Sequence, residues 1–256
     1  MESNDALIRY RAAHKVATVT LDNPERRNAL SLAMIAQLRA AIARASADPE
    51  VRAIVLDHSG PVFCAGADLT ESAAATDLDG LPAAHLAELL ADVVEAPKPV
   101  IALACGSARG GGTGLLAAAD IALIATAANV SFGEVRLGVV PAVIAPVVAR
   151  RLSPALMRQL FLTAETMQGD AAVRYGVCDM EVENAEDPSG ELAWAASQLL
   201  RGGPSALAGV KRLTAGPELR GQLRSAAALT AEYFFSDEGR EGVRSFIEKR
   251  APSWVH

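Results

Sequence analysis

Two glycine-containing turns have the residue types and spacing that could do chemistry. One follows the apolar run Val100–Ala104 and holds Gly110, Gly111 and Gly112 before the small-residue run Leu115–Ala119. A strand, a glycine turn and a helix in this order leave backbone N–H groups free to point at an anion or a developing oxyanion. Because glycine has no Cβ, a ligand can also approach the backbone closely.

The other turn, Phe63–Leu69 (FCAGADL), comes first in the chain and follows another apolar run, Ala53–Leu56. If the two turns face each other, each can supply one N–H donor to the same oxygen. Two such donors stabilise an enolate or a tetrahedral oxyanion. The alternative is that both segments are tight strand-to-helix turns without a ligand.

Other chemistries of glycine-rich loops fit this sequence less well. Gly112, Gly114 and Ala117 match the loose form of a dinucleotide fingerprint, but no acidic residue ends the following apolar run, Ile121–Ala125. A nicotinamide oxidoreductase would depend on that loose match alone. The sequence contains no Gly-Lys pair, which excludes a Walker-type phosphate loop.

Composition limits the partners and the compartment. The 256 residues carry a net charge of −6, so we expect no general nucleic-acid binding. The apolar stretches are too short or too interrupted to span a membrane, and the histidines lack metal-ligand spacing. Three scattered cysteines and a polar start, Met1–Asp5, favour buried thiols in a reducing compartment without a signal peptide. We therefore predict a cytoplasmic protein without metal.

Alternating strand and helix patterns predict the elements that hold the two turns. They favour an α/β fold with a parallel sheet, while Thr70–Leu81 shows no periodicity and is expected to be a loop. Beyond Pro141 the patterns become helical, which divides the chain into a core over 1–190 and a helical region over 191–256. The expected strands are 7–12, 16–21, 53–56, 100–104, 121–125, 130–132 and one within 176–182; the expected helices follow Ser31 and Ser153 and cover 82–95, 115–119, 191–200, 204–214, 219–235 and 238–249.

In this order and spacing, the segments resemble the crotonase family, also called the enoyl-CoA hydratase/isomerase family, over nearly the whole chain. The resemblance implies a spiral of repeated ββα units, closed by a helical C-terminal trimerisation region that builds a homotrimer or a hexamer. The segments that carry it are 27–31 (RNALS, an early CoA-contact loop), 63–69 and 110–112 (two oxyanion loops), 132–141 (FGEVRLGVVP, a catalytic-glutamate turn) and 235–252 (a C-terminal helix).

The resemblance also implies a site for an acyl-CoA thioester. The carbonyl oxygen would lie between the amides of Ala67 and Gly111, and Glu134 would move protons. Coenzyme A would enter as part of the substrate, so no separate cofactor is expected. The implied substrate and CoA contacts are Arg27, Ala29, Leu30, Ala65, Asp68, Leu69 and Gly110, with Phe246 and Lys249 at the adenine end, reaching a neighbouring subunit's ligand. Alternatively, Asp68 and Asp120 bind backbone N–H groups at helix ends or turns, and Lys249 is a solvated surface residue.

One departure from the family pattern keeps the reaction open. Hydratases of the family commonly use two glutamates, and the first falls at Gly114, where this chain has no carboxylate. Glu134 alone would have to take a proton from water and return it to carbon. A single base suits another reaction better, the migration of a double bond from the 3 to the 2 position, because one glutamate can lift the proton from C2 and return it to C4.

The turn 134–142 additionally resembles a branch of hydratases that act on branched, carboxylated substrates such as methylglutaconyl-CoA. Hydration of a 2-enoyl-CoA is therefore the first expectation, isomerisation is the second, and a CoA-thioester binder with little turnover is the third. A carboxylate on the substrate would meet Arg136 or Arg109, unless these arginines face solvent or pair with acids.

Overall fold

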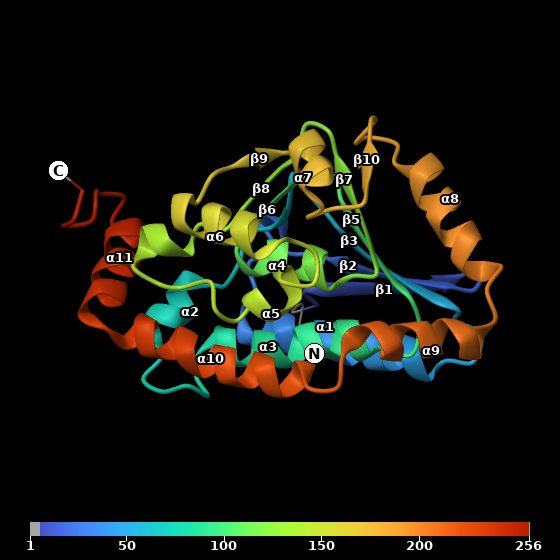
Figure 1. The fold of residues 1–256 in the computed structure, drawn as a ribbon, viewed down its shortest axis with the longest axis horizontal. Coiled ribbons are helices and arrows are strands. Elements are labelled where there is room, and N and C mark those ends of the chain that lie inside the picture. Colours follow the sequence, from blue (N-terminus) through green and yellow to red (C-terminus); the bar gives the residue numbers. More distant parts are fainter. Residues whose placement is uncertain (1–5, 256) are drawn as a thin grey trace.

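The computed structural model describes residues 6–255, which form two sheets wrapped by helices (Figure 1). The strands of the six-stranded sheet, in spatial order, are β1 (Ile8–Ala13), β2 (Val16–Leu21), β3 (Ala53–His58), β5 (Val100–Ala104), β7 (Ile121–Ala125) and β10 (Met180–Val182). The four-stranded sheet holds β4 (Val62–Cys64), β6 (Ser107–Arg109), β8 (Asn129–Ser131) and β9 (Met167–Gln168). All pairs are parallel except β1–β2 and β8–β9.

A repeated order of elements links the two sheets. β3 and β4 lead into helices α2 and α3, β5 and β6 into α4, and β7 and β8 into the short 3-10 helix η2. Each turn of this spiral therefore places one strand in each sheet and then a helix. This is the predicted ββα arrangement.

The helices and 3-10 segments up to residue 175 are η1 (Pro24–Arg26), α1 (Leu32–Ala47), α2 (Leu69–Ala74), α3 (Pro82–Glu95), α4 (Gly111–Ala118), η2 (Glu134–Leu137), α5 (Ala145–Val148), α6 (Pro154–Thr163) and α7 (Gly169–Tyr175).

Local signals explain where several helices begin. The hydroxyl of Ser31 accepts a hydrogen bond from the Met34 amide at the start of α1, and Ser153 does the same for Leu156 at the start of α6. Both are N-caps that satisfy an otherwise free amide. The two serine starts are confirmed, and α3 has the predicted bounds.

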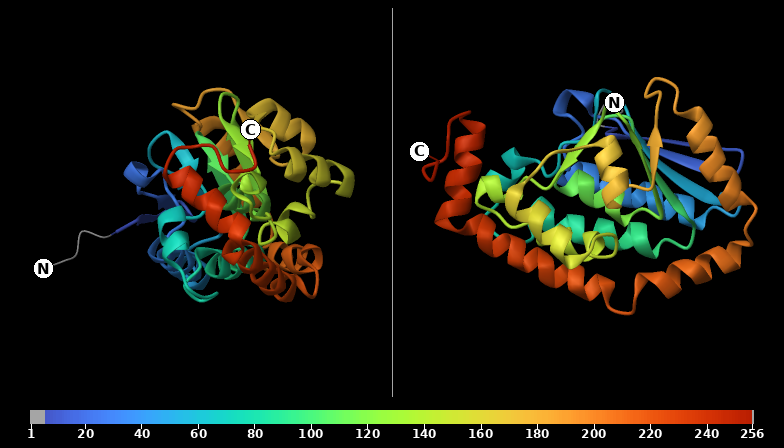
Figure 2. Two further views of the ribbon diagram at one scale, coloured as in Figure 1. Left: turned by 90° about the vertical axis from the view of Figure 1, so that its left-hand side faces the viewer. Right: turned by 45° about the horizontal axis from the view of Figure 1, so that its top comes forward.

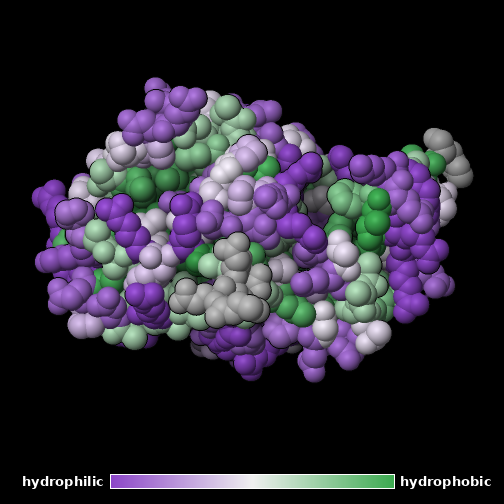
Figure 3. Space-filling view, turned by 180° about the vertical axis from the view of Figure 1, so that it is seen from behind, coloured by the Kyte–Doolittle hydropathy of each residue, from purple (hydrophilic) through white to green (hydrophobic). Residues whose placement is uncertain are grey.

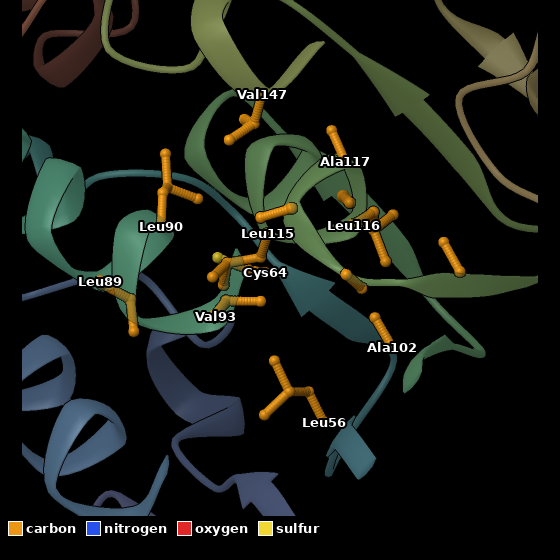
Figure 4. Packing of buried hydrophobic residues seen from close by; sticks show 14 of the residues in the cluster. Leu56, Cys64, Leu89, Leu90, Val93, Ala102, Leu115, Leu116, Ala117 and Val147 are labelled. Carbon is orange, nitrogen blue, oxygen red and sulfur yellow. The ribbon is translucent and has the colours of Figure 1, made fainter. Parts of the chain in front are cut away.

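Helix α4 lies in the centre of the core. All eight of its residues are buried, and Figure 4 shows Leu115 and Leu116 among side chains from β3, β4, β5, α3 and α5. Leu90 and Val147 pack in the same cluster. The N-terminus of α4, where the glycine turn lies, is therefore held by dense packing.

Four helices follow the spiral: α8 (Ser189–Leu200), α9 (Pro204–Ala215), α10 (Leu219–Phe235) and α11 (Asp237–Ile247). They run as one arc along the edge of the molecule, from orange to red in Figures 1 and 2. Ala195 of α8 packs on Val55 and Ile101 of the large sheet, and Arg220 of α10 pairs with Glu88 of α3 at 2.6 Å. Region 191–256 thus packs directly on the core, and its separation from 1–190 stays a prediction.

Two expectations about the chain near the turns were wrong. Part of the predicted loop 70–81 is helical, because Asp68 caps α2 and its side chain accepts hydrogen bonds from the amides of Thr70 and Glu71. Helix α4 begins at Gly111, four residues before the predicted start, because buried glycines there tolerate close packing. Within residues 6–255, no helix is both long and apolar enough to cross a lipid bilayer.

Candidate active site

The first turn is fixed by backbone pairing with the segment that precedes α1. The Ala65 amide donates to the Arg27 carbonyl at 3.0 Å, the Leu30 amide to Gly66 at 2.8 Å, and the Asp68 amide to Leu30 at 3.1 Å. Ala67 lies within this short parallel bridge, but its own amide takes no part in it. The pairing therefore orients the Ala67 N–H without consuming it.

The side chain of Asn28 fixes the same segment through hydrogen bonds, a role that sequence reasoning missed. Its side chain is fully buried and donates to the carbonyls of Ser59 at 3.0 Å and Val62 at 2.8 Å. It also accepts from the Asn23 amide at 2.8 Å. Its φ of +52° lies in the left-handed region, which asparagine tolerates better than most residues. The only sequence signal for this role was an asparagine within the polar segment 22–28.

The second turn faces the first. A Cβ built on Gly66 would lie 3.7 Å from the Gly111 amide nitrogen, and a Cβ built on Gly111 would lie 4.0 Å from the Ala67 amide nitrogen. Within residues 6–255 neither of these two amides donates a hydrogen bond. Gly111 is the first residue of α4, so the positive end of the helix dipole adds to this donor. Two free N–H groups thus converge from separate turns.

Glu134 lies against the second turn. It is the first residue of η2 and is separated from β8 by Phe132 and Gly133. The Gly110 amide donates to the carbonyl of Ser131 in β8 at 3.0 Å, which anchors this strand to the turn. A Cβ on Gly110 would lie 2.9 Å from Oε1 of Glu134, and Gly110 itself has a φ of +47°. Only glycine therefore fits between the turn and this carboxyl group.

The carboxyl group of Glu134 is shielded from water. Its Oε2 atom is buried and has no hydrogen-bond partner among the described residues. Burial raises the pKa of Glu134 to about 7, against a small opposing effect of its own backbone amide. A carboxyl group with this pKa can both accept and return a proton near neutral pH.

The position of the missing first glutamate is closed. A Cβ built on Gly114 would lie only 2.5 Å from Cγ2 of Ile144, and Leu90 packs from another side. Gly114 belongs to α4, one turn after Gly110, and its amide donates to the Gly110 carbonyl at 2.9 Å. No longer side chain fits at Gly114 unless Ile144 moves.

The two aspartates near the turns bind backbone amides. Asp68 caps α2 and pairs with Arg26 at 2.8 Å. Burial alone would raise the pKa of Asp68. The hydrogen bonds from Glu71, Arg26 and Thr70 outweigh burial, so the pKa is lowered. Asp120 accepts from the Val100 amide at 2.7 Å and pairs with Lys211. The alternative reading of both residues is confirmed.

The implied CoA contacts differ in their exposure. Arg27 is exposed, and Ala29, Ala65, Leu69 and Gly110 are half-buried. Leu30 is fully buried, and both its amide and its carbonyl pair with the first turn. Leu30 therefore positions this turn, and its contact with a ligand stays a prediction.

The remaining implied contacts lie on or just after the last helix, and the two candidate arginines bind backbone carbonyls. Phe246 and Lys249 are exposed on α11 and just beyond it. Arg109 donates to the Asn129 carbonyl at 2.9 Å, and Arg136 donates to the Ala164 carbonyl at 3.1 Å. Among the described residues, no group of three or more His, Cys, Asp or Glu side chains could hold a metal ion.

Comparisons with known proteins agree with this geometry. Residues 11–256 match the family model described as enoyl-CoA hydratase/isomerase. A Rhodobacter capsulatus protein named "Probable enoyl-CoA hydratase" is 36% identical over 97% of each chain. A crystal structure of an enoyl-CoA hydratase from Mycobacterium avium superposes with a TM-score of 0.87 at 36% identity, covering 98% of this chain and 100% of the other. A carnitinyl-CoA hydratase from the same species has a TM-score of 0.85 at 27% identity, covering 97% and 98%.

Proposed function

Because this chain belongs to the enoyl-CoA hydratase/isomerase family, we propose that it hydrates a 2-enoyl-CoA through a thioester enolate. The amides of Ala67 and Gly111 would bind the thioester oxygen, and Glu134 would move the protons. The observation that carries this proposal is Oε2 of Glu134, which is buried and has no hydrogen-bond partner within residues 6–255, beside the two free amides.

The proposed hydration uses one acid–base group. Ionised Glu134 takes a proton from water as the oxygen attacks C3, and the enolate that forms is held by the two amides. Protonated Glu134 then returns the proton to C2, so water adds to one face of the double bond. A pKa of about 7 suits both steps.

Double-bond migration is the second candidate, and the closed position at Gly114 favours it. With Ile144 against Gly114, no second carboxylate can hold and orient the water. Moving a proton from C2 to C4 requires only one base and the same enolate. The resemblance to the methylglutaconyl-CoA branch, in contrast, supports hydration.

Two substrates separate the candidates. Loss of enone absorbance on incubation with crotonyl-CoA supports hydration, and its appearance from a 3-enoyl-CoA supports migration. A protein that binds acyl-CoA but turns over neither substrate is the binder that was kept as a third possibility. Gly114→Glu together with Ile144→Ala opens the closed position; if water orientation limits hydration, this double variant hydrates crotonyl-CoA faster than Ile144→Ala alone.

We also propose that the chain works in the cytoplasm as a homotrimer or a hexamer. Large apolar side chains are exposed on the last four helices, and Figure 3 shows apolar patches within a mostly hydrophilic face of the molecule. The large exposed apolar side chains on these helices are Trp194, Val210, Leu213, Leu229, Tyr233, Phe246 and Ile247. Light scattering after gel filtration measures the assembly, and Leu213→Glu should shift it towards the monomer.

A further inference from the structure

A cavity of about 340 Å³ lies between α2 and α11, outside the residues assigned so far to the reaction. Ser72 of α2 and Ala75, the residue that follows this helix, form one wall, and Phe234 and Val243 contribute apolar surface. Arg240 and Arg244 of α11 lie at its edge. The cavity therefore combines an apolar interior with two guanidinium groups.

These two guanidinium groups are available to a ligand. Within residues 6–255, neither the Arg240 nor the Arg244 side chain forms a hydrogen bond or ion pair, although Arg244 lies in the field of Glu241. Arg250 binds that carboxylate at 2.6 Å and also pairs with Glu248, the acidic residue that lines the cavity. Both nearby acids are thus already paired, which leaves the cavity positive in a chain with net charge −6.

The cavity is continuous with the elements that carry the site. Helix α2 starts immediately after Ala67 and Asp68, and at about 1.5 Å per residue Ala75 lies roughly 10 Å further along. Helix α11 packs on the end of the Glu134 turn, where a Cβ built on Gly242 would lie 2.1 Å from the Leu137 carbonyl oxygen. Leu69, two residues after Ala67, and Leu137 of η2 pack against the apolar cluster that includes Phe234 and Val243 of the cavity wall. The site and the cavity thus share one apolar cluster, and the proposal takes the acyl group past these side chains.

We propose that this cavity binds the far end of the acyl group and selects substrates whose acyl chain ends in a carboxylate. The inference rests on the proposed function, because it assumes a thioester at Ala67 and Gly111. Arg240 and Arg244 are the carboxylate donors, since guanidinium groups bind carboxylates with charge-assisted hydrogen bonds. Arg109 and Arg136, the sequence-based candidates, are engaged with backbone carbonyls elsewhere.

Binding of two saturated probes tests the inference without requiring turnover. Hexanedioyl-CoA and hexanoyl-CoA have six-carbon acyl groups and differ in a carboxylate or a methyl group at C6. Calorimetry should give a dissociation constant at least about tenfold lower for hexanedioyl-CoA, from one charge-assisted hydrogen bond or more. Arg240→Ala/Arg244→Ala should abolish this preference and leave hexanoyl-CoA binding nearly unchanged.

Arg158→Ala is the matched control, since it removes from α6 an exposed arginine whose side chain has no partner among the described residues. It should keep the tenfold preference, which separates a local contact from a change in net charge. If the double variant does not fold, Arg240→Gln serves in its place. Equal binding of both probes to the wild-type protein, or a preference unaffected by the arginine variants, overturns the inference.

Turnover separates this inference from the proposed function. We expect a higher kcat/KM for 2-hexenedioyl-CoA than for 2-hexenoyl-CoA, with the ratio reduced about tenfold in the arginine variants. If neither is consumed but hexanedioyl-CoA still binds tighter, the proposed reaction fails and the carboxylate site stands. If both are consumed equally, the reaction stands and the carboxylate site fails.

Discussion

Two carboxyl groups flank the pair of turns, and their surroundings differ sharply. Asp68 follows the first turn and receives hydrogen bonds from two amides and from Arg26, which lower its pKa. Glu134 lies against the second turn with a buried oxygen that has no partner among the described residues, and burial raises its pKa to about 7. A carboxylate that accepts several hydrogen bonds stays ionised and serves a structural role. A carboxyl group that is buried without hydrogen-bond donors has a raised pKa, which prepares it for proton transfer.

Replacing Glu134 tests this contrast most directly. Glu134→Gln keeps the size of the side chain but cannot exchange a proton, so turnover should fall by about 10³-fold or more. Acyl-CoA affinity should change little, since the amides and the CoA loop remain. Steady-state kinetics together with calorimetry measure both quantities. Undiminished turnover would remove Glu134 from the mechanism.

A second change moves Glu134 without altering it. Gly110→Ala places a Cβ 2.9 Å from Oε1 and adds a side chain at a φ of +47°. Displacing the carboxyl group should lower kcat by roughly 10²-fold. Gly133→Ala is the matched control, because a Cβ there meets nothing within 4 Å and φ is −88°. Equal loss in the two variants would show that the close approach at Gly110 is irrelevant.

The pH dependence should report the same contrast. Catalysis starts from ionised Glu134, so kcat/KM should rise with pH and level off above an apparent pKa of about 7. The free energy of unfolding depends on pH with the opposite sign. Between the ordinary glutamate pKa of 4.5 and about 7 the folded chain binds the extra proton, so the free energy of unfolding falls as pH rises.

At about 1.36 kcal/mol per pKa unit, the fall in stability across this window amounts to about 3 kcal/mol. Urea unfolding at several pH values measures it, and Glu134→Gln should remove this part of the slope. A wild-type profile that is unchanged by Glu134→Gln would assign the titration to another group.

Much of this arrangement could be predicted from local signals. The serine caps, the alternation of β1 and β2, and the bounds of α3, β7 and α10 follow from periodicity and end signals that lie within one element. The helix at Leu69–Ala74 was missed because its six residues are too few to show a period. Its signal was the cap Asp68, which was weighed as a substrate contact and as a ligand for backbone amides.

The closeness of Glu134 to Gly110 could be expected only through family resemblance. It depends on β8 and β6 lying side by side, a pairing between residues about twenty positions apart that no local pattern reveals. The same limit applies to Ile144, which fills the space beside Gly114 from a different helix turn. Glycines in a turn indicate close approach, but the sequence does not identify the neighbour.

The smallest expected effect concerns Asp68, the structural member of the pair. Asp68→Asn keeps an oxygen that can cap α2 but loses the ion pair with Arg26, whose side chain is 56% exposed. The free energy of unfolding should fall by about 1 kcal/mol, and kcat only a few-fold, because the backbone bridge through Leu30 still orients Ala67. Arg26→Ala, which breaks only the ion pair, should cost less still. A loss of turnover in Asp68→Asn comparable to that in Glu134→Gln would mean that both carboxyl groups move protons, and the division of labour between the two turns would fail.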